Sequence, residues 1–342
     1  MERSVIEDFL IARKIDARLF ANISTNDFSR YSFQLGPQGT IKSFENSLRE
    51  FGLLVHSVNI PVLMTDFQNG LLHIDIVNKE LQTVSYDALL SLSRNEVSDY
   101  KLPLLLGKDY FGKSSTVDLI DLPHLLVGGT TGSGKSMFLH NIIQTLSNLR
   151  TSQEVRLILI DPKAVEFNLY ASQKNLAHSV ISDLSVALDV LQKAQSLMED
   201  RFKTLSKHGY RNIAECSPKH KMPYIVIIVD EVQSLLSYSK LAEPLLCSVA
   251  QKGRAAGMHL ILATQHPSRD VINANIKANF PARVGFKTAN ALYSRVLLDQ
   301  SGAESLMGKG DGLFKLDGHM SRFKSPLMDT TIKKKSFWDL LK

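Results

Sequence analysis

The sequence predicts an α/β fold, in which a mostly parallel sheet is covered by helices on both faces and is preceded by a small α+β domain. Three observations lead to this prediction. From residue 124 onward, apolar runs of strand length alternate with longer helical stretches, which is typical of parallel strands joined by crossover helices. Polar residues follow several of these runs, at the edge where such sheets bind their ligands. Residues 1–100 instead contain the hairpin signal Asn69-Gly70 between two partly alternating segments.

The small domain is predicted over residues 1–100. It is expected to open with a packing helix, because one helical face carries the apolar residues Val5, Ile6, Phe9 and Leu10. Strands are expected over 54–67 and 71–77, and a helix over 85–96. Residues 98–123 are expected to form a connector that contains the short strand-like pieces LPLLLGKD and STVDLIDLP.

The larger domain is predicted over residues 101–328, and a basic tail over 329–342. Its strands are expected at 125–129, 155–161, 224–229, 258–265, 282–286 and 312–316. Its helices are expected at 135–149, 183–208, 239–255 and 289–299.

Composition favours a cytoplasmic protein that lacks membrane spans and structural metal. No apolar run approaches the roughly 18–20 residues that cross a bilayer. The two cysteines, Cys216 and Cys247, cannot build a disulfide framework, and neither CxxC nor HExxH occurs. The net charge is +6, yet residues 1–100 hold 9 Lys and Arg against 13 Asp and Glu. The basic remainder therefore favours a polyanionic partner.

A phosphate-binding loop is predicted in GTTGSGKS, which follows an apolar strand and opens a helix. Its residues are Gly129, Thr130, Thr131, Gly132, Ser133, Gly134, Lys135 and Ser136. The glycines let backbone N–H groups point at phosphate oxygens, and the helix adds its positive end. Lys135 can reach the β- and γ-phosphates of ATP, and the Ser136 hydroxyl can bind Mg²⁺.

Two further strands end in residues suited to nucleotide hydrolysis. YIVIIVDE ends in two acids, although burying charge is costly, so we expect Asp230 to hold the Mg²⁺ shell and Glu231 to act as general base. LILATQ places Gln265 where its amide can contact the γ-phosphate or the attacking water. Together these motifs predict a RecA-like P-loop ATPase with ATP and Mg²⁺ as ligands.

These motifs and other segments resemble the FtsK/SpoIIIE family of DNA translocases in order and spacing. The segments are PHLLVGGTTGSGKS, ILIDPK, MEDRF, PYIVIIVDE, QKGRAAGMHLILATQHPS, IKANFPARVGF and LDQSGAESLMGKGDGLF. The resemblance covers residues 101–325, and more loosely the small domain. It implies hexameric rings that thread double-stranded DNA and bind ATP between subunits. Arg254, in KGRAAG, stands at the family's arginine-finger position, which implies that it reaches the γ-phosphate of a neighbouring subunit.

The DNA-facing segments depart from that family pattern. The family commonly has Arg where this chain has His266, and often has Lys where this chain has Ala291. Lys277 matches a basic loop residue, and Arg269 lies nearby. The candidate DNA contacts are therefore His266, Arg269 and Lys277. Loss of two positive charges should weaken phosphate contacts and lower the salt sensitivity of binding.

The sequence thus predicts an ATP-driven double-stranded DNA translocase that acts as a soluble ring and hydrolyses ATP at subunit interfaces. Membrane segments and a winged-helix module, found in septal family members, are not recognised in the sequence, so we expect a compact version. One alternative is a coupling or adaptor ATPase for a secretion or packaging machine, docking a protein partner through the tail TTIKKKSFWDLLK. The other is a ring that binds DNA without moving on it.

Overall fold

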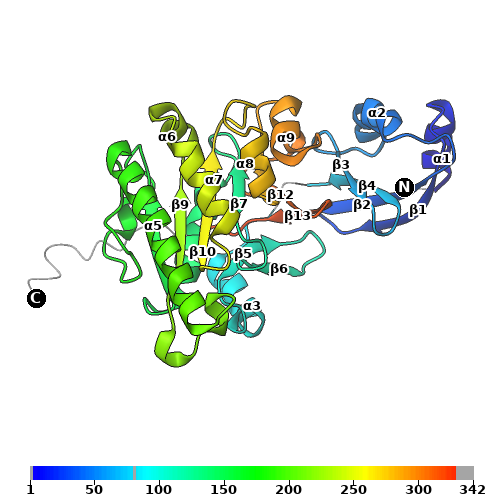
Figure 1. Cartoon of the computed structure of the whole chain (residues 1–342). Coiled ribbons are helices and arrows are strands. Elements are labelled where there is room, and N and C mark those ends of the chain that lie inside the picture. The colour runs from blue at the N-terminus through cyan, green and yellow to red at the C-terminus, as the bar shows by residue number, and fades with distance from the viewer. Residues whose placement is uncertain (1–2, 80–81, 329–342) are drawn as a thin grey trace, which may run out of the picture.

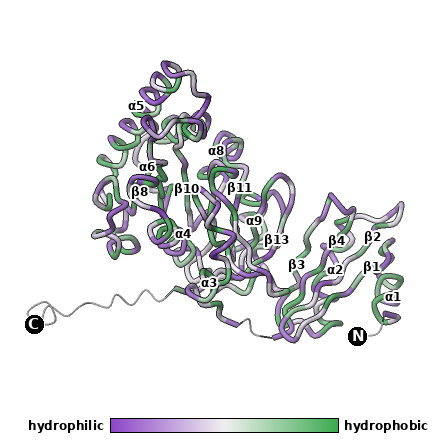
Figure 2. Tube along the Cα trace, turned by 90° about the horizontal axis from the view of Figure 1, so that it is seen from below, coloured by the Kyte–Doolittle hydropathy of each residue, from purple (hydrophilic) through white to green (hydrophobic). Residues whose placement is uncertain are grey.

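The computed structural model describes residues 3–79 and 82–328, and these residues form a sheet of four strands and a sheet of nine. The predicted tail, 329–342, lies outside the described residues. The two sheets lie side by side, with α1 (Arg3–Ala12) and α5 (Leu184–His208) at opposite ends of an elongated molecule (Figures 1 and 2). Within the described ranges, every helix is too short or too polar to cross a membrane.

The smaller sheet is antiparallel, with the spatial order β1-β2-β4-β3. Its strands are β1 (Ala17–Ser24), β2 (Phe28–Leu35), β3 (Val62–Asp66) and β4 (Leu71–Val77). Helices α1 and α2 (Ile41–Leu54) share one hydrophobic core with it. The predicted N-terminal helix is confirmed, with Ile6 and Leu10 buried. The predicted hairpin is also confirmed, because Asp66 pairs with Leu71 across the turn that contains Asn69 and Gly70.

The strand predicted over 54–67 is wrong at its start. Leu54 ends α2, and β3 begins only at Val62. The reason is that Phe44, Ser47 and Phe51, spaced three and four residues apart, bury one face of a helix. Strands β1 and β2 were not predicted.

The larger sheet has the order β6-β5-β13-β12-β11-β7-β10-β9-β8. Its parallel half consists of β7 (Leu125–Gly128), β8 (Val155–Ile160), β9 (Tyr224–Val229), β10 (Met258–Thr264) and β11 (Ala282–Phe286). Its antiparallel half consists of β5 (Pro103–Lys108), β6 (Ser114–Asp118), β12 (Asp311–Leu316) and β13 (His319–Lys324). The segment predicted to be a connector therefore supplies two strands of the main sheet.

Helices cover both faces of the parallel half, because successive strand residues point to opposite sides. In β9, Ile225 and Ile227 face the core beneath α5, whereas Val226 and Ile228 face the core beneath α4 (Lys135–Leu149). The remaining helices on the α5 side are α6 (Val232–Tyr238), α7 (Ala242–Lys252), α8 (Ala274–Asn279) and α9 (Ala291–Leu298). Figure 2 shows that α5 carries both hydrophobic and hydrophilic turns, as expected for a helix with one buried face.

The helix predicted over 239–255 is confirmed as α7, which begins at Ala242 and ends at Lys252, whereas α6, which ends at Tyr238 before the predicted range, was not predicted. The two helices are separated at Ser239, whose hydroxyl accepts a hydrogen bond from the Leu241 amide at 3.2 Å. Such local side-chain bonds compete with helical ones. Short 3-10 helices occur at Phe167–Tyr170, Ile213–Glu215, Pro218–His220 and Ala303–Ser305.

Helix α3 (Tyr86–Ser98) packs against β5 around Tyr86, Leu89, Val97 and Leu105. It thus contacts the larger sheet although it lies before residue 100. The predicted domain boundary at that residue stays a prediction.

A buried polar cluster joins the two sheets. Arg322 of β13 donates to both carboxylate oxygens of Asp311, at 3.0 and 2.8 Å, and Tyr110 donates to Asp311 at 2.7 Å. Phe28 of β2 stacks on Tyr110 with ring centroids 4.6 Å apart. Burial alone would raise the pKa of Asp311, but the Arg322 guanidinium outweighs it and holds that pKa below its ordinary value.

Candidate nucleotide-binding site

The predicted phosphate loop connects β7 to α4 at the carboxyl edge of the parallel strands. Gly132 and Gly134 have φ values of 75° and 113°, which side chains rarely tolerate. A Cβ atom on Gly134 would also come within 2.4 Å of the Gly310 amide nitrogen. The glycines at these positions are therefore required by the shape of the loop.

A second turn closes over this loop from the antiparallel half of the sheet. The Lys309 amide donates to the Gly132 carbonyl at 3.2 Å, and the Gly310 amide donates to the Ser133 carbonyl at 2.8 Å. This turn precedes Asp311 and thus the cluster that joins the two sheets. Sequence reasoning assigned it no role, although GKGDG has the glycine content of a tight turn.

Lys135 is buried and turned toward Asp230. Its Nζ atom donates to Asp230 Oδ1 at 2.6 Å and to the Asp230 carbonyl oxygen at 2.9 Å. The two side chains keep only 3% and 2% of their surface exposed. Each charge therefore compensates the other in a place where an isolated charge would be strongly unfavourable.

Glu231 is held at the same edge by the end of the neighbouring strand. Its Oε1 atom accepts a hydrogen bond from the Thr264 hydroxyl at 2.7 Å, and its Oε2 atom accepts one from the Gln265 backbone amide at 3.1 Å. The Thr131 hydroxyl donates to the Gln265 side-chain oxygen at 3.1 Å. The structure thus brings the three predicted strand-end residues, Asp230, Glu231 and Gln265, to the phosphate loop.

Glu166 is a site residue that sequence reasoning missed. The Ser136 hydroxyl donates to Glu166 Oε1 at 2.9 Å, and His140 Nε2 lies 3.4 Å from Glu166 Oε2. Burial, which outweighs the nearby Glu166 carboxylate, lowers the pKa of His140. The buried Asp161 carboxylate positions Glu166 by accepting from its amide at 2.8 Å. The acids that follow the strand in ILIDPKAVE were a signal that could have identified it.

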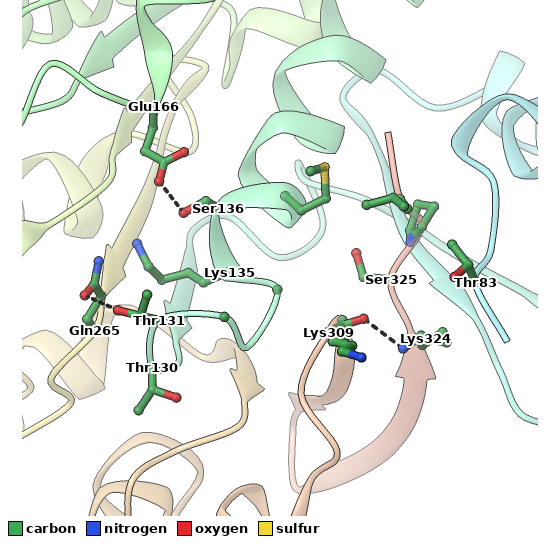
Figure 3. Close-up of a pocket in the computed structure, with 16 residues that line it drawn as sticks. Thr83, Thr130, Thr131, Lys135, Ser136, Glu166, Gln265, Lys309, Lys324 and Ser325 are labelled. Carbon is green, nitrogen blue, oxygen red and sulfur yellow. Dashed lines mark hydrogen bonds between the residues drawn. The ribbon is translucent and has the colours of Figure 1, made fainter. Parts of the chain in front are cut away.

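The phosphate loop, Glu166 and Gln265 line a pocket of about 490 Å³. Figure 3 shows Gln265, Thr131 and Glu166 on one side of the phosphate loop, and Thr83 and Ser325 on the other. The pocket is lined by Thr83, Thr130, Thr131, Gly132, Gly134, Lys135, Ser136, Met137, Glu166, Gln265, Lys309, Gly310, Lys324, Ser325, Pro326 and Leu327. Seven of these lining residues, at 83, 137, 166 and 324–327, lie outside every motif identified in the sequence.

Arg254 lies at the opposite edge of the sheet. It is exposed, in the turn that precedes the first residue of β10, whereas Gln265 follows the last residue of that strand. A strand of this length separates the two by roughly 20 Å. Arg254 is therefore remote from the phosphate loop of its own chain.

The three candidate DNA contacts fall in different surroundings. His266 and Arg269 are exposed in the loop that leaves the carboxyl end of β10. Lys277 belongs to α8, and its Nζ atom lies 2.6 Å from Asp299 Oδ1. Asp299 also pairs with Arg283 and Lys315, so the charge of Lys277 is shared within a cluster.

Comparisons with known proteins place this site in a family. The profile of the FtsK/SpoIIIE family matches residues 88–221 and 215–269. DNA translocase FtsK 2 of Neisseria meningitidis serogroup A is 35% identical over 345 residues, which cover 92% of this chain and 34% of that protein. DNA translocase FtsK of Leptospira interrogans is 41% identical over 288 residues, covering 81% of this chain and 30% of that protein. This chain belongs to the FtsK/SpoIIIE family. It spans about a third of the length of these relatives.

Solved structures of P-loop ATPases resemble this FtsK/SpoIIIE chain and confirm its fold. The pCW3 conjugation coupling protein TcpA, in a monomer form with ATPγS, matches 95% of this chain and 93% of its own, with a TM-score of 0.67 and 22% identity. The cytoplasmic domain of the type VII secretion ATPase EccC from Thermomonospora curvata matches 75% of this chain and 33% of its own, with a TM-score of 0.63 and 23% identity.

The donor set of this family member suits Mg²⁺. Ser136 and Asp230 offer hard oxygen ligands at the edge where the phosphates of a nucleotide would lie. Within residues 3–79 and 82–328, no cluster of three or more His, Cys, Asp or Glu side chains could hold a metal by itself. Mg²⁺ usually takes one or two protein oxygens together with phosphates and water, so the Ser136 and Asp230 oxygens fit this ion.

Proposed function

We propose that this chain is the motor of an ATP-driven translocase for double-stranded DNA. The observation that carries the proposal is the buried Glu231 carboxylate, which lies beside the Lys135–Asp230 pair and is bonded to the strand end that carries Gln265. A binding switch requires the lysine and the aspartate, whereas hydrolysis also requires a base for the attacking water. Membership of the FtsK/SpoIIIE family supports DNA as the substrate.

ATP binding would redirect the Lys135 ammonium from Asp230 toward the phosphates. Ser136 and Asp230 would hold Mg²⁺, which neutralises phosphate charge when it is bound. Glu231, fixed by Thr264 and by the Gln265 amide, would accept the proton of the attacking water. Gln265 would exchange its bond with Thr131 for one with the γ-phosphate.

Ring assembly would complete the site. Arg254 is exposed and lies at the far edge of its own sheet, so only a nucleotide on another subunit is within its reach. An arginine supplied in this way stabilises the charge of the transition state and makes hydrolysis dependent on assembly. A homo-hexamer, as the family resemblance implies, would place one such arginine at each interface.

The loop that follows Gln265 would carry the response to DNA. His266 and Arg269 are exposed in this loop, within four residues of the glutamine that would contact the γ-phosphate. Loss of that phosphate would move the loop and its contacts with the DNA backbone. Those contacts would be independent of base sequence, because phosphates carry no sequence information.

The test uses the Glu231→Gln variant, which keeps the size of the side chain and removes the base. We expect ATP turnover to fall by about 10²–10⁴-fold while ATP still binds. The matched control is Glu199→Gln, a change to an exposed acid on α5. Unchanged turnover in Glu231→Gln would contradict its role as the base. Failure of double-stranded DNA to stimulate the wild-type ATPase at low salt would contradict DNA as the substrate.

The coupling or adaptor ATPase is a second candidate, favoured by the extent of the structural match with the coupling protein TcpA. The two candidates differ in whether the chain moves along DNA. A translocase strips the third strand from a DNA triplex in an ATP-dependent manner. Robust DNA-stimulated hydrolysis without strand displacement would favour a coupling protein or a ring that does not move.

A further inference from the structure

Arg201 is a buried arginine that the nucleotide site described above does not use. It belongs to α5, whose buried face runs through Ala194, Met198, Arg201 and Leu205, spaced three and four residues apart. Only 5% of the Arg201 surface is exposed. A charged side chain therefore stands at a position where the helical pattern predicts an apolar one.

The Arg201 guanidinium connects the starts of two neighbouring strands. Its Nη1 atom donates to the Ala256 carbonyl at 2.6 Å, and its Nη2 atom donates to the Pro223 carbonyl at 2.8 Å. Pro223 directly precedes β9, and Ala256 lies two residues before β10. Both acceptors are neutral, and burial lowers the pKa of the guanidinium to about 10. The side chain therefore stays charged at neutral pH, although burying a charge is unfavourable.

The Ala256 carbonyl belongs to the turn that carries Arg254. Two carbonyls of this turn accept hydrogen bonds from other segments of the chain. The Ala255 carbonyl accepts from the Ile213 amide at 3.0 Å, and the Ala256 carbonyl accepts from Arg201. The bond from Arg201 has a charged donor, and such bonds are roughly twice as strong as neutral ones. Arg201 thus supplies the stronger of the two bonds that hold this turn from outside.

The turn is also closely packed against its surroundings. Gly257 has a φ of 66°, which side chains rarely tolerate, and a Cβ atom there would overlap the Ile213 side chain. The Gly257 amide donates to the Arg254 carbonyl at 3.1 Å, which closes the turn on itself. The exposed Arg254 side chain therefore starts from a backbone that is held on two sides.

We propose that Arg201 is a positioning residue for Arg254, and that it holds the turn so that the Arg254 guanidinium meets the nucleotide of a neighbouring subunit in the geometry that hydrolysis needs. The inference rests on the proposed function, in which Arg254 acts between subunits. A guanidinium suits this task because its planar fork can bond two carbonyls on separate strands at once. Precise placement matters, because a displacement of about 1 Å can cost about 10²-fold in rate.

The first experiment measures ATP turnover and ATP affinity in Arg201→Lys, which keeps the charge but has a single ammonium that cannot bridge both carbonyls. Turnover should fall by about 10–10²-fold. ATP affinity should stay unchanged, because neither Arg201 nor Arg254 lines the pocket. Arg201→Met, which fills the apolar face of α5 without a charge, is a second variant and should lose turnover in the same way. Arg211→Lys, the same change at an exposed arginine just beyond α5, is the matched control.

The second experiment repeats Arg201→Lys in a chain that already carries Arg254→Ala. If Arg201 acts through Arg254, this change should lower turnover no further, because the group that it positions is gone. A residue that only stabilised the sheet would lower turnover by the same factor in both chains. Equal losses with and without Arg254 would therefore overturn the inference, and so would normal turnover in Arg201→Lys and Arg201→Met.

These outcomes are separable from a failure of the proposed function. Normal turnover in Arg254→Ala alone would show that Arg254 does not act between subunits, and the positioning role would be overturned with it. Lost turnover in Arg254→Ala, together with normal turnover in the Arg201 variants, would overturn the positioning role alone. Movement along DNA is measured separately by displacement of a triplex strand, so a chain that fails to move can still show that Arg254 depends on Arg201.

Discussion

The two edges of the parallel half-sheet treat buried ionisable groups in opposite ways. At the carboxyl edge, Lys135 and Asp230 are buried as a pair 2.6 Å apart. At the amino edge, His124 and His259 are fully buried, and burial lowers their pKa values to about 3 and about 4. At the first edge, the opposite charges of Lys135 and Asp230 compensate each other. At the second edge, burial disfavours the charged imidazolium, so both histidines are neutral.

The two histidines at the amino edge connect neighbouring segments of the chain through hydrogen bonds. His124 Nδ1 accepts from the Leu260 amide at 2.9 Å, and His259 Nδ1 lies 2.7 Å from the Pro123 carbonyl, to which it donates. These bonds join the starts of β7 and β10 beneath Arg254. Of His124, His259 and Arg254, only Arg254 is exposed. The comparison therefore teaches that Arg254 is the side chain at this edge that can contact a charged group outside its own chain.

The largest effect expected at the amino edge is that of Arg254→Ala. ATP turnover should fall by about 10³–10⁵-fold, as for loss of other arginines supplied by a neighbouring subunit. ATP binding should change little, since Arg254 is far from the pocket of its own chain. Steady-state hydrolysis and nucleotide affinity are the two measurements, and Arg94→Ala, on the exposed face of α3, is the control.

Mixing inactive variants sharpens this test. Arg254→Ala subunits retain Glu231, and Glu231→Gln subunits retain Arg254, so mixed assemblies should regain part of the activity at interfaces that combine both intact residues. Mixtures that stay inactive would show that Arg254 does not act between subunits.

The buried histidines predict a dependence of stability on pH. Above pH 6.5, their ordinary pKa, both are neutral whether the chain is folded or unfolded, and their full contribution to stability is present. As the pH falls toward 4, the unfolded chain binds protons that the folded chain excludes, so the free energy of unfolding should fall by about 1.4 kcal/mol per pH unit for each histidine. Urea unfolding between pH 7 and pH 5 measures this slope.

The His259→Asn variant isolates one histidine. Asn can donate to the Pro123 carbonyl but takes up no proton, so the slope should fall by the contribution of one histidine, about 1.4 kcal/mol per pH unit. His178→Asn, at an exposed histidine, should leave the slope as it was. An unchanged slope in His259→Asn would contradict the conclusion that His259 is neutral in the folded chain.

The smallest effects are expected from single DNA contacts at the carboxyl edge. Arg269→Ala should weaken double-stranded DNA binding severalfold and reduce the slope of log affinity against log salt by about one. Lys277→Ala should do less, because its ammonium is held by Asp299. Burial would raise the pKa of Asp299, but its bonds with Lys277 and Lys315 outweigh that effect and hold the pKa below its ordinary value. Equal losses of DNA affinity in Arg269→Ala and Lys277→Ala would contradict the expectation that Asp299 holds Lys277 away from DNA.

Much of the nucleotide site could be predicted from the sequence. The phosphate loop, Asp230, Glu231 and Gln265 stand at strand ends, and local patterns are enough to find them. Glu166 and residues 325–327 were missed because their roles depend on contacts with residues far away in the chain.

The sequence by itself determined the parallel strands, the glycines of the phosphate loop and the acids of the site, since each follows from short-range pattern and backbone geometry. Only the tertiary structure decided that residues 103–118 and 311–324 complete the same sheet, and that Arg254 lies at the edge away from its own phosphate loop. The same holds for Lys277, which is tied to Asp299. The physical reason is that strand order and ion pairing join residues distant in sequence, which periodicity does not record.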